Sequence, residues 1–313
     1  MRVHRHVLMI IAALAGALAP ASAQTDPAED EMPTRTLAEA RAGQAANVAK
    51  DYRQPNKPVV PPASWMKLVS YPGPLGDMAG YLSGVPDKEE RRPAIIWISG
   101  GDTAIGDFWS PQPRANDQSA AALREAGMVV FYPAVRGLNG NPGQVESYYG
   151  ELDDLVAATR WLKAQPFVDP DRVYLGGHSS GGTMALLASE YAAEWAGVVA
   201  FGPVTDPLFY GSGLWGVQPV AADDANGQWL RAPINWLDSI TAPTLVLEGR
   251  QGNAGEIAAF AQANSNPKAR FHVVKGCTHF SILRPASELV AATMRDGSFA
   301  ALLARDSFEL TCG

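Results

Sequence analysis

Short apolar runs alternate with helical patterns along the chain from about residue 65 onward. Residues 94–99 (AIIWIS) are almost continuously apolar, as expected of a strand buried on both faces of a sheet. Strands and helices alternate over most of this region, which predicts an α/β fold with a mainly parallel sheet flanked by helices. The eight predicted strands span residues 66–71, 78–83, 94–99, 128–132, 172–176, 197–201, 244–248 and 271–275, and the helices span residues 116–126, 146–164, 180–193, 255–263 and about 286–308.

The first residues have the pattern of a secretory signal peptide. Arg2 and Arg5 precede an apolar run over residues 7–18, and residues 21–23 (ASA) form a small-x-small cleavage site. The apolar run is shorter than the ~20 residues that a membrane-spanning helix needs. We therefore expect removal of residues 1–23 and export to the periplasm or the exterior, without a membrane anchor.

Residues 24–63 differ in composition from the rest of the chain. They are rich in Ala, Pro, Glu and Asp and contain few large apolar side chains. A helix is possible around residues 36–50, whereas residues 55–62 contain four prolines, as is typical of an extended linker. We expect an N-terminal extension or linker over residues 24–63 and one globular domain over residues 64–313.

Composition and charge exclude several classes of function. Apolar residues make up 47% of the chain and charged residues 18%, which indicates a globular protein with a large core. The formal net charge of −7 disfavours a broad basic surface for nucleic acid. Two cysteines are too few for a four-cysteine zinc site, but in an oxidising compartment they tend to pair. We expect a disulfide between Cys277 and Cys312, with two buried free thiols as the alternative.

A candidate nucleophile follows the strand predicted over residues 172–176. Residues 177–181 (GHSSG) match the Gly-x-Ser-x-Gly pattern of a sharp strand-to-helix turn that exposes a serine hydroxyl. The glycines are needed because side chains there would collide with the adjacent helix and strand. We expect Ser179 to be the nucleophile and the backbone N–H of Ser180 to be one oxyanion donor, since it opens the following helix. The alternative is a glycine-rich turn without chemistry.

Three histidines remain once the signal peptide is removed, and a serine nucleophile needs one of them as a base. In this type of site the histidine follows the last strand. His279 occupies that position, whereas His178 is expected to serve packing or substrate contact, and His272 lies inside a predicted strand. We therefore expect His279 to be the base.

The second oxyanion donor is expected in the loop after the third strand. That loop reads SGGD over residues 99–102, and its two glycines allow the backbone to approach a substrate oxygen closely. We take Gly101 as the donor, although the pattern alone does not distinguish it from Gly100.

A resemblance to a known family is clear at this point. The stretch over residues 132–182, which ends in the segment LGGHSSGG, resembles the catalytic domain of the prolyl oligopeptidase-like branch of the α/β-hydrolases, and so do residues 232–243 (APINWLDSITAP). The resemblance covers about residues 65–305. It implies an eight-stranded α/β-hydrolase fold, a serine hydrolase, and the roles of nucleophile and base for Ser179 and His279.

The chain departs from the family's pattern in two ways. Only residues 24–63 separate the expected cleavage site from the first strand, so no β-propeller is expected before the hydrolase domain, which weakens a peptidase interpretation. The family also places an Asp about three residues after the Gly that closes the seventh strand, and Gly252 stands there.

The sequence therefore leaves the identity of the acid that orients the base open. Glu248, at the end of the seventh strand, is our first choice, since its longer side chain could reach across. Asp206, a few residues after the sixth strand, is the second. Glu256, or a serine–histidine dyad without an acid, completes the alternatives.

Two further features have competing interpretations. Residues 203–240 are too long for a simple turn and could form a small lid, whose aromatic side chains either bind an apolar substrate group or anchor the segment to the body. A charged cluster follows the fourth strand and is expected to form ion pairs rather than to bind a charged substrate. The aromatic residues are Phe209, Tyr210, Trp215, Trp229 and Trp236, and the charged ones are Arg136, Glu146, Glu151, Asp153 and Asp154.

The sequence thus predicts an exported serine hydrolase that cleaves carboxylic esters of small molecules through an acyl-enzyme. Cleavage of small peptides is the first alternative, and a non-catalytic binding protein with a hydrolase fold is the second. We expect no cofactor and no metal, because no metal-ligand spacing, phosphate loop or dinucleotide fingerprint is convincing.

Overall fold

The computed structural model describes residues 35–85, 90–101, 104–107, 109–110, 112–211, 220–221 and 223–312. The expected signal peptide lies outside the described residues, as do residues 24–34 of the expected extension and most of residues 212–222 in the expected lid.

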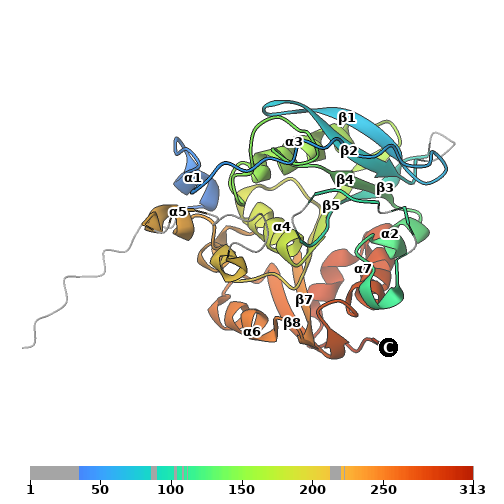
Figure 1. Cartoon of the computed structure of the whole chain (residues 1–313). Helices are drawn as coiled ribbons and strands as arrows, with labels where there is room; N and C mark the ends of the chain where they lie inside the picture. Colours follow the sequence, from blue (N-terminus) through green and yellow to red (C-terminus); the bar gives the residue numbers. More distant parts are fainter. Residues whose placement is uncertain are drawn as a thin grey trace, which may run out of the picture. The chain divides into compact units, whose positions relative to one another are not determined.

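A mixed sheet of eight strands runs through the described part of the chain (Figure 1). Its order is β1-β2-β4-β3-β5-β6-β7-β8. The first two strands are antiparallel to each other, and β2 is also antiparallel to β4, whereas all pairs from β4 to β8 are parallel. The prediction of a mainly parallel eight-stranded α/β sheet is confirmed. The strands are β1 (Lys67–Gly73), β2 (Gly76–Ser83), β3 (Arg92–Ile98), β4 (Val129–Pro133), β5 (Val168–His178), β6 (Val198–Phe201), β7 (Thr244–Gln251) and β8 (Ala269–Thr278).

Helices cover both faces of this sheet. Successive residues of β3 show why: Ile96 joins the core that contains α3 and α4, whereas Ile95 and Trp97 join the core that contains α2 and α7. Because side chains alternate along a strand, a continuous apolar run has both faces buried. The helices are α1 (Leu37–Arg41), α2 (Ala121–Glu125), α3 (Glu151–Lys163), α4 (Ser180–Tyr191), α5 (Ala225–Trp229), α6 (Ala254–Ala263) and α7 (Leu283–Asp296), with 3₁₀ turns η1 (Arg114–Asn116), η2 (Pro207–Tyr210), η3 (Pro233–Asn235), η4 (Leu237–Ser239) and η5 (Phe299–Ala304).

Two helices are shorter than their apolar patterns predict. The helix expected over residues 116–126 is reduced to η1 and α2, because Ala120 has a left-handed backbone (φ 50°) that interrupts it. The helix expected from residue 146 begins at Glu151 instead. The Glu151 carboxylate accepts the backbone N–H groups of Glu146 and Tyr149, which holds the preceding residues in a loop.

The expected extension is not a free linker in its described part. Leu37 is fully buried, and α1 contacts α4. The Arg41 guanidinium donates to the carbonyl oxygens of Tyr148 (2.9 Å) and Leu230 (2.7 Å). Further along, the Gln54 N–H donates to the Gly137 carbonyl. The low content of large apolar residues concealed this docking, because it depends on a few side chains, such as Leu37 and Arg41, and on backbone hydrogen bonds.

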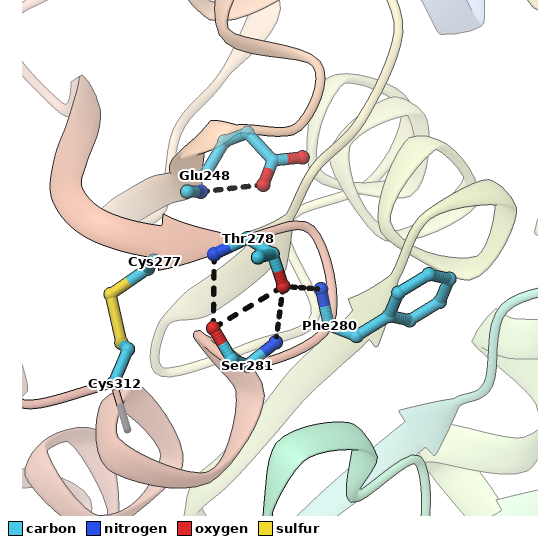
Figure 2. Close-up of a disulfide and its surroundings, with 7 residues drawn as sticks. Glu248, Cys277, Thr278, Phe280, Ser281 and Cys312 are labelled. Atoms are coloured by element: carbon cyan, nitrogen blue, oxygen red, sulfur yellow. Dashed lines mark hydrogen bonds between the residues drawn. A yellow bond between two sulfur atoms is a disulfide. The ribbon is translucent and has the colours of Figure 1, made fainter.

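The expected disulfide between Cys277 and Cys312 is present and joins the end of β8 to the C-terminal tail (Figure 2). Cys277 itself is fully buried. Within the residues that the structure describes, no helix combines the length and apolar character needed to cross a membrane.

Candidate active site

The turn between β5 and α4 holds Ser179 in an unusual backbone conformation, with φ 55° and ψ −120°. A non-glycine residue with positive φ is strained, and such strain is concentrated at functional sites. The flanking glycines have no room for side chains. A Cβ on Gly177 would overlap the carbonyl oxygen of Gly181, and one on Gly181 would overlap the carbonyl oxygen of Ile98. The Gly-x-Ser-x-Gly pattern therefore forms the tight strand-to-helix turn that the sequence predicts.

The two backbone positions expected to stabilise an oxyanion lie together. The Ser180 hydroxyl donates to the Gly101 carbonyl oxygen at 2.6 Å, which ties the start of α4 to the loop after β3. Gly101 has φ +86°, a conformation that favours glycine. The Gly100 N–H donates to the Gln118 side chain (3.3 Å), so this amide is already engaged. A Cβ on Gly100 would lie 3.1 Å from that of Ser179, which shows how close this loop comes to the turn.

His279 and Glu248 form a hydrogen-bonded pair at the ends of adjacent strands. Nδ1 of His279 lies 2.6 Å from Oε2 of Glu248, and the Glu248 side chain is fully buried. The second carboxylate oxygen, Oε1, accepts the backbone N–H of Gly249. Both oxygens therefore have partners, which fixes the carboxylate in the orientation that serves the imidazole.

The other two candidate acids are engaged elsewhere. Asp206 caps η2 by accepting the Leu208 N–H at 2.8 Å. Glu256 accepts both the backbone N–H and the hydroxyl of Thr205, each at 2.7 Å. Of the acids considered from the sequence, Glu248 is the one that the structure brings to His279.

Two glycines make the space for this pair. A Cβ on Gly252, where the family pattern expects an Asp, would lie 2.5 Å from Oε1 of Glu248. Gly202 has φ +58°, and a Cβ there would overlap Oε2 of Glu248 and lie 2.7 Å from Nδ1 of His279. The carboxylate of Glu248 therefore occupies the volume that a side chain at position 252 would need.

The serine turn and the histidine loop meet at the carboxyl edge of the sheet. The Ser179 N–H donates to the Phe201 carbonyl oxygen (2.7 Å), and the next residue, Gly202, lies against the His279 ring. The ring of His178, adjacent to Ser179, is 4.4 Å from that of His279. This edge is where open α/β sheets carry their sites.

His178 connects two loops of this site. Its Nε2 lies 3.0 Å from the His279 carbonyl oxygen, and its Nδ1 lies 2.9 Å from Oε1 of Gln118. Burial, together with the nearby His279, lowers the pKa of His178 to about 3, so the ring is neutral at physiological pH. His178 therefore holds the backbone of His279, in line with the packing role expected for it. His272 lies within β8, and its ring packs against that of Phe308 in the C-terminal tail.

Tyr210 is a site residue whose role the sequence did not reveal. Its hydroxyl is 2.9 Å from the Thr183 hydroxyl, and it lies close enough to the Ser179 side chain for that side chain to lower the pKa of Tyr210. Burial raises the pKa of Tyr210, so the phenol stays protonated. Its ring stacks on Tyr148 at 6.5 Å. The only available signal was its place among the aromatic residues of the expected lid, which gave no hint of contact with the serine.

The described part of the expected lid also contains anchoring aromatics. Trp229 and Trp236 pack against each other at 4.3 Å, and Trp236 is buried. Phe209, in contrast, is 61% exposed. Trp215 lies outside the described residues. Anchoring therefore explains Trp229 and Trp236.

The charged cluster after β4 is satisfied internally. The buried Arg136 guanidinium pairs with Asp154 (2.8 Å) and Glu146 (3.0 Å), which confirms the ion-pair interpretation. Asp153 accepts the Tyr191 hydroxyl at 2.7 Å. Burial raises the pKa of Glu151 to about 7. Among the described residues, no group of three or more His, Cys, Asp or Glu side chains could hold a metal ion.

A strained serine turn, an imidazole–carboxylate pair and an α/β sheet that brings them to one edge define a serine hydrolase of the α/β-hydrolase class. Comparison with known proteins gives the family. The Peptidase_S9 profile, described as the prolyl oligopeptidase family, matches residues 114–279, more than half of the chain. The chain belongs to this family, and the expected resemblance is confirmed.

Both peptidases and esterases occur among the relatives. The chain is 32% identical to "Uncharacterized peptidase YtmA" of Bacillus subtilis over 177 residues, which cover 53% of this chain and 65% of that protein. It is 27% identical to "Esterase LipI" of Mycobacterium tuberculosis over 174 residues, which cover 54% and 49%. The matched part spans less than two thirds of the length of these curated relatives.

Solved structures share the fold. Puromycin hydrolase superposes with a TM-score of 0.60 at 17% identity, covering 79% of this chain and 40% of that one. An esterase of Pyrobaculum calidifontis gives a TM-score of 0.56 at 16% identity, covering 76% and 88%. The similarity at these identities shows the α/β-hydrolase fold alone.

Proposed function

We propose that this serine hydrolase is exported and cleaves carboxylic esters, with Ser179 as nucleophile, His279 as base and Glu248 as the acid that orients it. The observation that carries the proposal is the strained Ser179 turn beside the His279–Glu248 pair, whose hydrogen bond is 2.6 Å long. Acyl transfer needs a nucleophile, a base and a group that holds the base, and these residues supply all three.

Each residue has one role in the proposed reaction. The Ser179 hydroxyl attacks the ester carbonyl carbon while Nε2 of His279 takes its proton. Glu248 accepts the hydrogen bond from Nδ1 and stabilises the imidazolium that forms. The imidazolium then protonates the leaving alcohol, which departs and leaves an acyl-enzyme. Water, activated by His279, attacks the acyl-enzyme and releases the carboxylic acid.

Backbone amides of Ser180 and Gly101 are proposed to stabilise the oxyanion. The first opens α4, where the partial positive charge of the helix terminus favours an anion. The hydrogen bond from the Ser180 hydroxyl to the Gly101 carbonyl supports a fixed spacing between the two amides. Loss of one such donor raises the barrier by about 3–4 kcal/mol in other enzymes.

The charged cluster after β4 favours esters over peptides as substrates. A peptidase that recognises the amino end of its substrate needs a carboxylate to bind it, and in the charged cluster after β4 the carboxylates of Glu146, Asp154 and Glu151 are already engaged by Arg136 and by backbone N–H groups. Cleavage of small peptides remains the second candidate, because the family and one of its named relatives are peptidases.

Relative rates on ester and peptide-like substrates distinguish an esterase from a peptidase. We expect turnover of p-nitrophenyl esters with kcat/KM at least tenfold above that of Xaa-Pro anilides, and loss of both activities in Ser179→Ala. The reverse preference would identify a peptidase. Unchanged ester hydrolysis in Ser179→Ala would overturn the proposed mechanism.

Export is proposed from the signal-peptide pattern of residues 1–23 and is supported by the disulfide, which is typical of oxidising compartments. Expression of the full chain in its own host type, followed by cell fractionation and N-terminal sequencing, tests it. We expect an extracytoplasmic protein that begins at Gln24. A cytoplasmic protein that retains residues 1–23 would contradict it.

A further inference from the structure

Phe280 is an exposed aromatic residue in direct contact with the site. Its side chain is 44% exposed. Its ring centroid lies 5.0 Å from that of His279 and 5.6 Å from that of His178, with an edge-to-face arrangement in both cases. Scattered exposed apolar residues need no explanation, but this one extends the apolar surface of the imidazole that performs the chemistry.

The turn that carries Phe280 is held rigidly. The Thr278 hydroxyl accepts the backbone N–H groups of Phe280 (3.3 Å) and Ser281 (3.0 Å), and the Thr278 N–H donates to the Ser281 hydroxyl (2.9 Å). The preceding residue, Cys277, is bonded to Cys312. Figure 2 shows the Phe280 ring projecting from this turn on the side away from the disulfide. The ring is therefore presented to solvent with its backbone already fixed.

The direction of proton transfer decides which part of a substrate meets this ring. In acyl transfer the imidazolium protonates the leaving group, so the leaving oxygen must lie within hydrogen-bond distance of Nε2 of His279. The rest of the alcohol then extends over the surface next to His279. The acyl chain leaves the same carbon in a different direction and need not cross this surface.

We propose that Phe280 forms the binding surface for the alcohol part of the substrate and selects esters of aromatic or other flat apolar alcohols. This inference rests on the proposed function, because it takes His279 as the group that protonates the leaving alcohol. It adds a specificity-determining residue and names the side of the ester that is recognised.

Competition between alcohols for one acyl-enzyme tests the inference most cleanly. An alcohol that attacks the acyl-enzyme occupies the same place as the leaving group, because the two reactions are the reverse of each other. The acyl donor is p-nitrophenyl acetate, and benzyl alcohol and ethanol compete as acceptors. The ratio of benzyl acetate to ethyl acetate then depends only on the surface that binds the alcohol. It is independent of the fraction of folded enzyme, since only active molecules make either product.

We expect Phe280→Ala to lower this product ratio about three- to tenfold, the range expected for one aromatic contact. Phe280→Tyr should retain the wild-type ratio, and Phe280→Leu should fall between. The control is Leu75→Ala, which shortens a similarly exposed apolar side chain in the turn between β1 and β2, at the opposite end of the strand order from β8, and which should leave the ratio unchanged.

A second measurement compares phenyl acetate with ethyl acetate. Both form the same acetyl-enzyme, so Phe280→Ala should lower kcat/KM for the phenyl ester more than for the ethyl ester. An equal loss on both esters with an unchanged product ratio would mean that Phe280 merely supports His279, and would overturn the inference. So would a ratio in Phe280→Ala that equals the wild-type ratio.

Failure of the inference can be told apart from failure of the proposed function. If the Ser179→Ala variant still forms both acetates, the acyl-enzyme assignment itself is wrong. If Ser179→Ala is inactive and Phe280→Ala retains the wild-type ratio, only the leaving-group surface is wrong.

Discussion

Replacement of Glu248 by Gln is the sharpest test of how the base is oriented. The carboxylate accepts two N–H groups, one from His279 and one from the backbone of Gly249. Gln has one acceptor oxygen, so its NH₂ must face one of these partners. If the oxygen stays on Gly249, the amide N–H points at Nδ1 of His279 and favours the tautomer that carries hydrogen on Nε2. That tautomer cannot take the proton from Ser179.

The expected loss follows from this change of tautomer. We expect kcat of Glu248→Gln to fall about 10³- to 10⁴-fold, as when the acid of a serine–histidine–acid triad is replaced by its amide. This corresponds to a rise of about 4–5.5 kcal/mol in the barrier. The assay is kcat at saturating p-nitrophenyl acetate at pH 8, together with thermal melting to show that the variant is folded.

Matched amide substitutions at the other two acids provide the control. Asp206→Asn and Glu256→Gln each keep an oxygen for the N–H group that the carboxylate now accepts, and neither acid touches His279. Both variants should stay within about threefold of the wild-type kcat. A Glu248→Gln enzyme within tenfold of wild type, or a larger loss in either control, would refute the assignment of Glu248.

Gly252, which stands where the family pattern has an Asp, allows a stronger form of the same test. Gly252→Asp alone should lower activity, because its side chain would collide with the Glu248 carboxylate. In a Glu248→Ala background that space is free, and Gly252→Asp should recover at least about tenfold of the lost kcat, since the new carboxylate enters the volume beside His279. The same substitution would thus have opposite effects in the two backgrounds. Loss in both would contradict the idea that the two positions share one volume.

Three further predictions concern stability, pH and backbone space. The disulfide closes a loop of 35 residues, so the double variant Cys277→Ser, Cys312→Ser should have a free energy of unfolding about 4 kcal/mol below that of the wild type. Urea denaturation measures this difference, and equal unfolding midpoints for the variant and the wild type would contradict it. The pKa of buried Glu151 is raised to about 7, so the folded protein keeps a proton that the unfolded protein releases above pH ~4.5. This proton stabilises the fold at low pH, and the stabilisation is lost as the pH rises to about 7. Glu151→Gln should therefore reduce the decline in the free energy of unfolding over pH 5–7.5 by up to about 3 kcal/mol, and an unchanged pH dependence would refute this. Gly202→Ala should lower kcat about tenfold or more, because the new methyl group would collide with Glu248 and His279. The control is Gly297→Ala: Gly297 also has a positive φ but has open space around it, so the substitution should lower stability and leave kcat unchanged. Equal losses of kcat in the two variants would show that backbone strain alone is responsible.

The fold was predictable from the sequence because its signals are local. The continuous apolar character of β3 and the glycine-flanked Ser179 depend on a few adjacent residues, and both features are where the patterns predict them. Element ends were less predictable, since they depend on contacts from elsewhere. The start of α3 at Glu151 follows from hydrogen bonds to the preceding loop, which apolar periodicity does not record.

The parts of the site that the sequence left open depend on three-dimensional space. The choice between Glu248 and Asp206 could not be made from spacing, because Glu248 lies near the end of β7 and Asp206 follows β6, and both strands end at the same edge of the sheet. The hydrogen bond from His279 identifies Glu248, whose carboxylate fits because Gly252 has no side chain, and a glycine in a sequence does not reveal which group fills the space beside it. Contact between Tyr210 and Ser179 likewise joins residues from two separate loops.

The central claim is that Ser179 forms the covalent intermediate. The most direct measurement is reaction with a fluorophosphonate, followed by peptide mass spectrometry of the labelled protein. The account predicts one phosphonyl group on Ser179, no label in Ser179→Ala, and labelling slowed in Glu248→Gln. A label on Ser180 or on another residue, or labelling that persists at the wild-type rate in Ser179→Ala, would contradict it.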